Sequence, residues 1–360
     1  MRALPPHGPR RKGAAILVPL FAAIALAAPG CGKGRGPGGE SGPAAGPSGS
    51  PPPAKRLRLR VGHFPNVTHA QGLIAHHFSR EAQAGRRAKG WFEERLGDDV
   101  EVSWYVYNAG PSAMEAIFTG ALDLSYVGPN PALNAFVRSG GAEIRIVSGA
   151  ARGGSALVVK KDSKIQGPED FRGLRIGTPQ LGNTQDVACR AWLVEHGLRV
   201  TEAGGDAHVV PTANPDQLAL FLRGDLHGVW TVEPWVARLE LEAGGRVLVD
   251  DREAVTTVLV SSTKFLRERP DVARKFVEAH EELTAWIEAN PEEARKAVAE
   301  ALAAETRTAV SPAVIGRSWE RLRFTSEIDV ASIESFLRLA QKVGFLKGAP
   351  PLSGLMEVPR

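Results

Sequence analysis

The residues best suited to bind a ligand lie in one polar stretch, residues 177–186, which reads GTPQLGNTQD. It follows a short apolar run and precedes a segment with helical spacing. Asn183 and Thr184 are residue types that cap helices, and Thr178 and Gln180 add neutral hydrogen-bonding groups. A polar loop that leads from a strand into a helix exposes backbone N–H groups, which suit a small anion. The alternative is an ordinary capped turn with no ligand.

Three earlier loops, residues 64–68, 108–112 and 128–131, have the same character. Each is rich in Gly, Pro, Asn, Ser or Thr and connects an expected strand to an expected helix. The candidate ligand-binding residues of these loops are Asn66, Thr68, Gly110, Ser112, Gly128 and Asn130. Helix capping alone would also explain Asn66, Thr68 and Ser112. For Asn130 we favour a place in the binding cleft.

A carboxylate and two tryptophans lie near the end of a further expected strand, in Trp230-Thr231-Val232-Glu233-Pro234-Trp235. A carboxylate repels an anion unless it is paired, so Glu233 either contacts an amino group of the ligand or caps the helix that follows. Trp235 and Trp230 either line the apolar part of the ligand or pack in the core. These alternatives stay open at the level of sequence.

Other kinds of site are not predicted. His69, His76 and His77 lie on one expected helix, but adjacent histidines point in different directions, so we expect no metal site. Cys189 is expected to be a small buried apolar residue. No nucleophile with a base, phosphate-binding loop or pair of carboxylates stands out, so we expect no catalytic residues, no cofactor and no enzyme activity.

The elements that must position these loops follow a strand–helix rhythm that occurs twice. Strands are expected at 57–61, 100–107, 122–127 and 144–148, and again at 174–176, 207–210 and 228–231. Residues 263–343 read as almost entirely helical. This alternation predicts an α/β protein with mostly parallel sheets. We expect one lobe from 56–151 plus 257–360 and a second from 152–256, with apolar runs at 156–159 and 255–260 crossing between them. Ligands bind at the carboxyl ends of such strands.

The first residues read as a targeting segment. Arg10, Arg11 and Lys12 precede an apolar run at 14–28, and small residues then lead to Cys31. We expect 1–30 to be a lipoprotein signal peptide, with Cys31 lipidated, and the Gly- and Pro-rich 31–55 to be a disordered tether. The alternative is a plain secretory signal. Residues 1–30 carry four basic residues and no acid, which accounts for the net charge of +4. The rest is neutral, which argues against a nucleic-acid partner.

Several segments together resemble the substrate-binding proteins of ABC importers for aliphatic sulfonates, taurine and nitrate. The segments are 120–131, 177–188, 214–228 and 230–235, and the resemblance extends over about 57–345. It implies a two-lobe type II periplasmic-binding fold with a hinge of two crossing strands and a helical C-terminal segment. The lobes of such a protein close on a small anion, whose head is held mostly by neutral donors and helix N-termini.

The resemblance also implies the setting in which the protein acts. We expect a monomeric receptor outside the cytoplasmic membrane, anchored by lipid at Cys31, that delivers an aliphatic sulfonate or taurine to an ABC permease and its ATPase. A nitrate or pyrimidine-type solute, or a role as a ligand-presenting sensor, remains an alternative. A related branch makes a thiamine precursor with a cysteine cluster, and this chain, with only Cys31 and Cys189, lacks that cluster.

Overall fold

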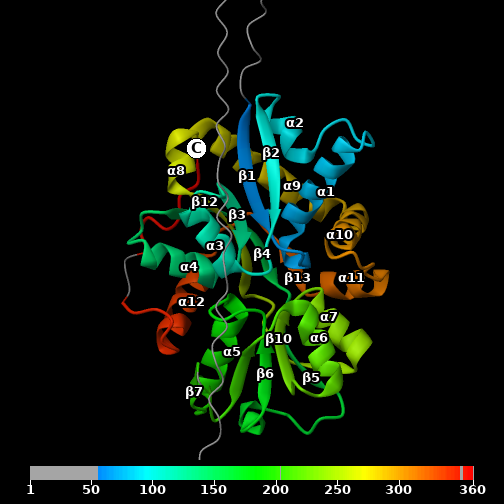
Figure 1. The fold of residues 1–360 in the computed structure, drawn as a ribbon, viewed down its shortest axis with the longest axis vertical. Helices are drawn as coiled ribbons and strands as arrows, with labels where there is room; N and C mark the ends of the chain where they lie inside the picture. Colours follow the sequence, from blue (N-terminus) through cyan, green and yellow to red (C-terminus); the bar gives the residue numbers. More distant parts are fainter. Residues whose placement is uncertain (1–55, 203, 349–351, 360) are drawn as a thin grey trace, which may run out of the picture. The chain divides into compact units, whose positions relative to one another are not determined.

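Two mixed β-sheets form the framework of the protein in the computed structural model, which describes residues 56–202, 204–348 and 352–359 (Figure 1). The first sheet has the strand order β13-β4-β12-β3-β1-β2. Its strands are β1 (Leu57–His63), β2 (Val100–Val106), β3 (Leu124–Val127), β4 (Ile144–Gly153), β12 (Val255–Ser262) and β13 (Leu322–Phe324). Strand β1 pairs in parallel with β2 and β3, whereas β12 runs antiparallel between β3 and β4.

The second sheet has the order β11-β5-β10-β6-β9. It contains β5 (Ser155–Lys160), β6 (Arg175–Thr178), β9 (His208–Pro211), β10 (Gly228–Val232) and β11 (Gly245–Asp250). Strands β6, β9 and β10 are parallel, and β5 is antiparallel to β10 and β11. A separate hairpin joins β7 (Val200–Thr201) to β8 (Gly204–Gly205).

Helices cover both faces of each sheet. Those of the first sheet are α1 (Ala70–Gln83), α2 (Trp91–Leu96), α3 (Gly110–Phe118), α4 (Pro129–Arg138), α8 (Thr263–Glu268), α9 (Pro270–Ala289), α10 (Pro291–Thr306), α11 (Pro312–Trp319) and α12 (Val330–Lys342). Those of the second sheet are α5 (Thr184–Glu195), α6 (Asn214–Arg223) and α7 (Trp235–Ala243). Short 3-10 turns occur at Val67–His69 and Pro168–Phe171. We call the first sheet with its helices the first lobe and the second sheet with its helices the second lobe.

Each sheet has an apolar layer on both of its faces. On one face of the first sheet, α1, α2, α9 and α10 pack around a stacked pair, Phe92 and Phe276, whose ring centres lie 4.0 Å apart. On the other face, α3, α4 and α12 form a second layer. Strand β12 is buried along its whole length because it lies in the middle of the sheet. This double coverage explains why the strand segments read as apolar runs.

The chain passes between the lobes twice, and both connections are short. Strand β4 leads through Gly154 into β5, and residues 251–254 join β11 to β12. Gly153 and Gly154 both have a φ of 69°, a left-handed conformation that favours glycine, where the chain leaves the first sheet. All the described residues belong to one unit, residues 53–360. The predicted two-lobe α/β fold is confirmed, with mixed rather than mostly parallel sheets.

The structure differs from the sequence-based expectation in a few short elements. Strand β13 interrupts the C-terminal region that was expected to be helical and pairs at the edge of the first sheet with β4. Helix α2 and the β7–β8 hairpin were also not predicted. Elements this short carry too few residues to show a hydrophobic period.

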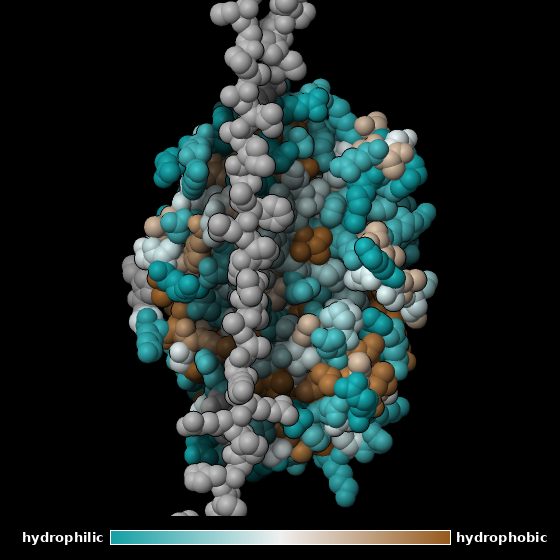
Figure 2. All heavy atoms as spheres, viewed as in Figure 1, coloured by the Kyte–Doolittle hydropathy of each residue, from teal (hydrophilic) through white to brown (hydrophobic). Residues whose placement is uncertain are grey.

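The expected signal peptide, tether and lipidated Cys31 lie outside the described residues. Among the described helices, none combines the length and the apolar character that crossing a membrane requires. The surface drawn in Figure 2 is mainly hydrophilic. Large exposed apolar side chains in the described part of the chain, such as Tyr105, Leu222 and Leu241, are scattered.

Candidate functional site

A cavity of about 30 Å³ lies between the two lobes. Nearly all of its lining follows the carboxyl end of a strand: the segments after β1, β2 and β3 in the first lobe, and those after β6, β9 and β10 in the second. The lining residues are Phe64, Asn66, Thr68, His69, Asn108, Ala109, Gly110, Gly128, Pro131, Pro179, Asn183, Thr184, Gln185, Asn214, Val232 and Thr256. Such strand ends are the usual place for a ligand in α/β proteins.

Five helical N-termini meet at this cavity. Helices α3, α4, α5 and α6 and the 3-10 turn Val67–His69 all begin within the lining segments. The first N–H groups of a helix lack partners inside the helix and carry a partial positive charge. The lining contains no Asp, Glu, Lys or Arg. The cavity therefore offers a positive field and hydrogen-bond donors without a formal charge, which suits a small anion.

His69 is the one titratable side chain in the lining. It is buried, its ring lies 4.3 Å from that of Phe64, and its Nδ1 atom has no hydrogen-bond partner. Burial lowers the pKa of His69 well below its usual value. The imidazole ring is therefore neutral at neutral pH.

The two lobes are in contact across the cleft. Asn130 donates from Nδ2 to the main-chain oxygen of Gly182 at 2.7 Å. Asn214 donates from Nδ2 to Oδ1 of Asn66 at 3.3 Å. The structure is thus a closed form, and because one water needs about 10–15 Å³ the cavity has room for very few waters. An alkanesulfonate would need the lobes to move apart before it could enter.

The polar stretch 177–186 is built around a buried carboxylate. Asp186 accepts hydrogen bonds from Thr178 Oγ1 at 2.9 Å and from Gly182 N at 2.9 Å. The backbone N–H of Asp186 donates to Oδ1 of Asn183 at 2.8 Å. Asn183 is thereby the N-cap of α5. Arg190 is also buried, and its Nε atom lies 3.0 Å from Oδ2 of Asp186, so its positive charge compensates that carboxylate. Part of this stretch therefore shapes the loop, and Asn183 and Thr184 are left at the cavity.

The structure brings together some of the candidate residues named from sequence and places others elsewhere. Asn66, Thr68, Gly110, Gly128, Asn183 and Thr184 line the cavity. Ser112, Asn130, Thr178, Gln180, Glu233 and Trp235 do not. Of these, Ser112 donates its hydroxyl to the main-chain oxygen of Ala109 at 2.8 Å, within the first turn of α3, and Asn130 connects the lobes.

Glu233 is fully buried in a structural role. Its carboxylate accepts hydrogen bonds from Ala237 N at 3.0 Å and Ser318 Oγ at 2.9 Å, and it pairs with Arg321 at 3.0 Å. Burial raises the pKa of Glu233, while these three donors oppose the rise. The structure thus shows the capping role for Glu233 rather than one at the ligand cavity.

Trp235 belongs to a different depression on the surface. That pocket, of about 240 Å³, also involves Pro65, Pro215 and Leu302 and lies outside the ligand cavity. Trp230 packs in the core of the second lobe. Neither tryptophan lines the cavity between the lobes.

Sequence reasoning missed several lining residues. Asn108, Gln185 and Asn214 are polar residues inside segments that had been singled out, but they were not among the candidate ligand-binding residues. Asn214 opens α6 after the end of β9, so the strand-end rule would have found it. His69 and Thr256 gave no such signal, because only packing brings them to the cavity.

Comparisons with known proteins give a family for the chain and several relatives of lower similarity. Residues 52–303 match the NMT1-like family. The taurine-binding periplasmic protein of Escherichia coli (strain K12) is 26% identical over 225 residues, covering 61% of this chain and 67% of that protein. A protein described as a putative aliphatic sulfonates-binding protein from the same strain is 27% identical over 161 residues, 44% of this chain and 48% of that protein.

Solved structures show the same fold. The alkanesulfonate-binding protein SsuA from Xanthomonas axonopodis pv. citri, bound to MOPS, has a TM-score of 0.62 at 20% identity, covering 80% of this chain and 92% of that chain. The periplasmic nitrate-binding protein NrtA from Synechocystis PCC 6803 has a TM-score of 0.65 at 14% identity, covering 82% of this chain and 83% of that chain.

Proposed function

The chain belongs to the NMT1-like family, and from that premise we propose that it is an extracytoplasmic solute-binding protein that delivers a small organic anion to an ABC importer. The proposed ligand class is aliphatic sulfonates and taurine, which two of the similar proteins are named for. In this proposal the protein acts as a monomer that binds, carries and releases its solute without chemical change, and its partners are the permease and the ATPase.

The observation that carries the proposal is the uncharged cavity at which five helical N-termini meet. A sulfonate head has three oxygen acceptors and one negative charge. Backbone N–H groups and the neutral side chains of Asn66, Thr68, Asn183 and Thr184 supply matching donors. Because no lysine or arginine pairs with the head, binding is strong enough for capture and weak enough for release.

Lobe closure is the proposed mechanism of capture. The ligand would enter an open form and contact one lobe, and closure would then remove it from water and bring the second set of N-termini to it. The bonds of Asn130 to Gly182 and of Asn214 to Asn66 exist only when the lobes meet. They therefore favour the closed form, which is the form a permease can distinguish.

The residues that line the cavity also favour one kind of ligand over another within this class. Taurine carries an ammonium group, and the cavity residues include no carboxylate to receive it. Glu233, the nearest candidate from sequence, is already paired with Arg321. We therefore propose an anion with an uncharged tail, such as an alkanesulfonate, ahead of taurine.

Nitrate is the second candidate, and the small cavity favours it. A planar ion of four heavy atoms fits a space of about 30 Å³ with less opening than a sulfonate needs. The fold is shared with a nitrate-binding protein, so the scaffold does not decide between the two.

Isothermal titration calorimetry with ethanesulfonate, taurine, nitrate and sulfate tests the proposal. The buffer must contain no sulfonate, since a structurally similar protein was solved with MOPS bound. We expect ethanesulfonate to bind one-to-one, taurine to bind more weakly, and the thermal midpoint to rise, because ligand at about 100 times its Kd adds about 2.7 kcal/mol of stability. Nitrate binding without sulfonate binding would establish the second candidate. Failure of all four anions would refute the proposal.

Thr184→Ala localises the site. Its hydroxyl lies at the cavity, and loss of about 1 kcal/mol of hydrogen bonding would weaken binding about fivefold. Thr119→Ala is the matched control, because that residue ends α3 on the exposed surface. Equal affinity in both variants would place the ligand elsewhere.

The lipid anchor at Cys31 is a separate proposal, supported by the basic and apolar residues that precede it. It is tested by metabolic labelling with a fatty acid in cells that express the full chain, with Cys31→Ser as the control. We expect label on the parent chain and none on the variant.

A further inference from the structure

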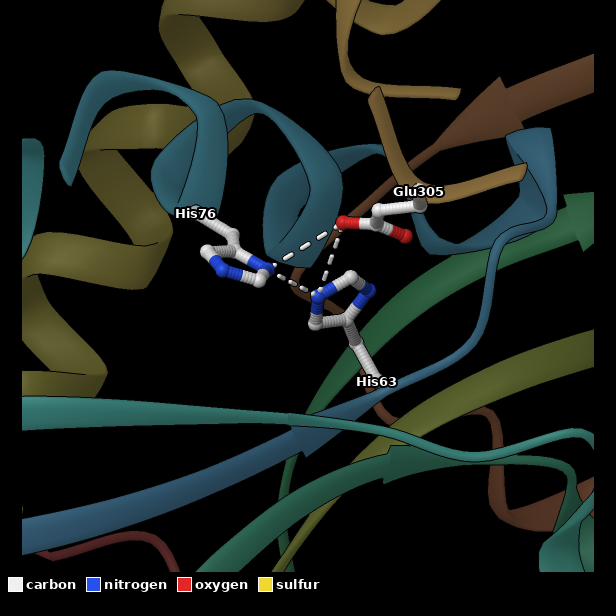
Figure 3. A group of neighbouring side chains, drawn as sticks. All are labelled: His63, His76 and Glu305. Carbon is white, nitrogen blue, oxygen red and sulfur yellow. Dashed lines mark hydrogen bonds and ion pairs between the residues drawn. The ribbon is translucent and has the colours of Figure 1, made fainter. Parts of the chain in front are cut away.

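Two histidines and a glutamate from distant parts of the chain converge inside the first lobe. His63 is the last residue of β1, His76 lies on α1, and Glu305 lies near the end of α10 (Figure 3). His63 Nε2 is 2.9 Å from His76 Nδ1, and Glu305 Oε1 is 3.4 Å from the first and 3.1 Å from the second. Figure 3 shows the three side chains pointing toward one another.

These separations match the edges of a metal coordination polyhedron. Two ligands at about 2.0–2.1 Å from a tetrahedral zinc ion lie about 3.3 Å apart. The three edges here, 2.9, 3.4 and 3.1 Å, are close to that value. Three atoms in such a triangle can all contact one ion without a change of backbone.

The tautomer of His63 leaves a lone pair facing the cluster. His63 Nδ1 lies 3.3 Å from the carbonyl oxygen of Phe64. Because a carbonyl only accepts, His63 carries its proton on Nδ1, and its Nε2 presents a bare lone pair. His76 can supply at most one proton at Nδ1, which then faces two acceptors, His63 Nε2 and Glu305 Oε1.

The second oxygen of Glu305, Oε2, is buried and has no hydrogen-bond partner. The side chain of Glu305 is only 2% exposed. A buried carboxylate oxygen without a partner is costly. Arg80 already pairs with this carboxylate through Oε1, and a cation at the cluster would be a second positive partner for it.

We propose that His63, His76 and Glu305 bind a divalent transition-metal ion of the zinc, cobalt or nickel kind. Two imidazoles and one carboxylate form a ligand set that such ions prefer over calcium or magnesium. The remaining coordination positions are left to water, and the side chain of His76, 16% exposed, lies on the side that faces solvent. The bond from His63 to the Phe64 carbonyl is the outer contact that commonly orients a metal-bound histidine.

One nearby cation opposes the metal, because Arg80 Nη2 donates to Glu305 Oε1 at 2.8 Å. A carboxylate oxygen has two lone pairs, so Arg80 and the ion can share it, and Arg80 holds the affinity to a moderate level.

A metal ion at this position would cross-link three elements of the first lobe. It would join β1, α1 and α10 directly behind Phe64, which lines the ligand cavity. Metal occupancy is thereby expected to raise the thermal midpoint, since the ion binds the native state only. This inference does not depend on which anion the cleft binds.

Neighbouring His77 provides a matched control. His77 Nε2 pairs with Glu300 Oε2 at 3.1 Å, but within the described part of the chain no third ligand joins them. His76→Gln and Glu305→Gln remove one ligand each from the cluster and keep the size of the side chain. His77→Gln makes the same change one residue away.

The test uses the untagged chain after treatment with a chelator. Zn²⁺ is titrated by calorimetry and Co²⁺ by its visible absorption, which reports imidazole and carboxylate ligands. We expect one ion per chain, at least about tenfold weaker binding in His76→Gln and Glu305→Gln, and less than a twofold change in His77→Gln. Absence of one-to-one binding in the parent chain overturns the proposal, and so does equal affinity in all variants.

A second measurement tests the proposal even if one of these variants fails to fold. Trp104 stacks on His76 with ring centres 5.4 Å apart and lies 5.6 Å from His63. Bound Co²⁺ or Ni²⁺ is expected to quench the fluorescence of Trp104. Trp104→Phe should keep the calorimetric binding and lose that part of the quenching. Quenching of the same size in Trp104→Phe would show that the ion lies elsewhere.

Discussion

The side-chain amide of Asn130 donates a hydrogen bond to the main-chain oxygen of Gly182 at 2.7 Å, across the cleft between the two lobes. Asn130 is at the start of α4 in the first lobe, and Gly182 lies in the loop before α5 in the second. The bond is buried, and separation of the lobes would break it. In the proposed closure, Asn130 would therefore favour the closed form without lining the cavity.

Asn130→Ala is expected to weaken solute binding without removing a ligand contact. Loss of a net hydrogen bond of about 0.5–1.5 kcal/mol in the closed form corresponds to about a 2- to 10-fold rise in Kd. Calorimetry on the variant measures this change. Asn134→Ala on the same helix is the control, and it should retain the parent affinity. A variant at Asn130 that binds as tightly as the parent would show that the bond does not favour closure.

Gly128→Ala is expected to obstruct closure by steric contact. An added Cβ would lie 2.2 Å from Oγ1 of Thr184, which is on the opposite lobe. The backbone of Gly128 has a φ of −69°, which alanine adopts without strain, so each lobe should fold normally. We expect solute affinity to fall by about tenfold or more, since about 1.4 kcal/mol of strain in the closed form is enough.

Two further variants sharpen this test. Gly316→Ala adds the same methyl group on α11, where no atom lies within 4 Å, and should bind like the parent. The double variant Gly128→Ala with Thr184→Gly removes the obstructing side chain and should recover part of the affinity. A single Gly128→Ala variant with unchanged affinity would show that the solute is bound in a more open form.

The buried pair of Glu233 and Arg321 is expected to be essential for stability. Arg321→Met would leave the carboxylate of Glu233, which is fully buried, without its compensating charge. We expect the free energy of unfolding to fall by about 3–5 kcal/mol, as measured by urea denaturation. Arg274→Met, which breaks the solvent-exposed pair with Glu278, should cost less than about 1 kcal/mol. Similar losses in the two variants would contradict this prediction.

His280 is expected to make the protein less stable in mild acid. It is buried between Tyr126, whose hydroxyl lies 3.0 Å from Nδ1, and the oxygen of Gly149, 2.8 Å from Nε2. Burial lowers the pKa of His280 from 6.5 to about 4. Between these values the unfolded chain binds a proton that the folded chain does not, so stability is complete above pH 6.5 and is lost as the pH falls toward 4.

The loss due to His280 amounts to about 3 kcal/mol when the whole interval is crossed, at about 1.4 kcal/mol per pKa unit. Urea denaturation at a series of pH values measures the dependence. In His280→Gln the slope of stability against pH should fall by up to one proton relative to the parent. An unchanged slope would mean that His280 is charged in the folded protein. The difference between the two proteins isolates His280 from the other buried histidines.

The sequence by itself determined the architecture and the loops that could bind a ligand. The strand–helix alternation occurs twice, and the elements lie close to the expected ranges: the run expected at 57–61 is part of β1, and the run expected at 228–231 is part of β10. Hydrophobic period and capping residues are local properties, so they can be read without knowing the fold. The same reasoning located Asn66, Gly128, Asn183 and Thr184 in loops that line the cavity.

Only the tertiary structure decided which side chains meet. Glu233 could equally have faced a ligand amine, but the fold brings Arg321 to it from 88 residues away. Asn66 contacts Asn214 across 148 residues, and Glu305 joins His63 and His76 from the far end of α10. Such contacts depend on how whole elements pack and on where each side chain points, and neither leaves a periodic signal in the chain. The pattern of residues therefore determined the framework, while packing between distant elements determined the site.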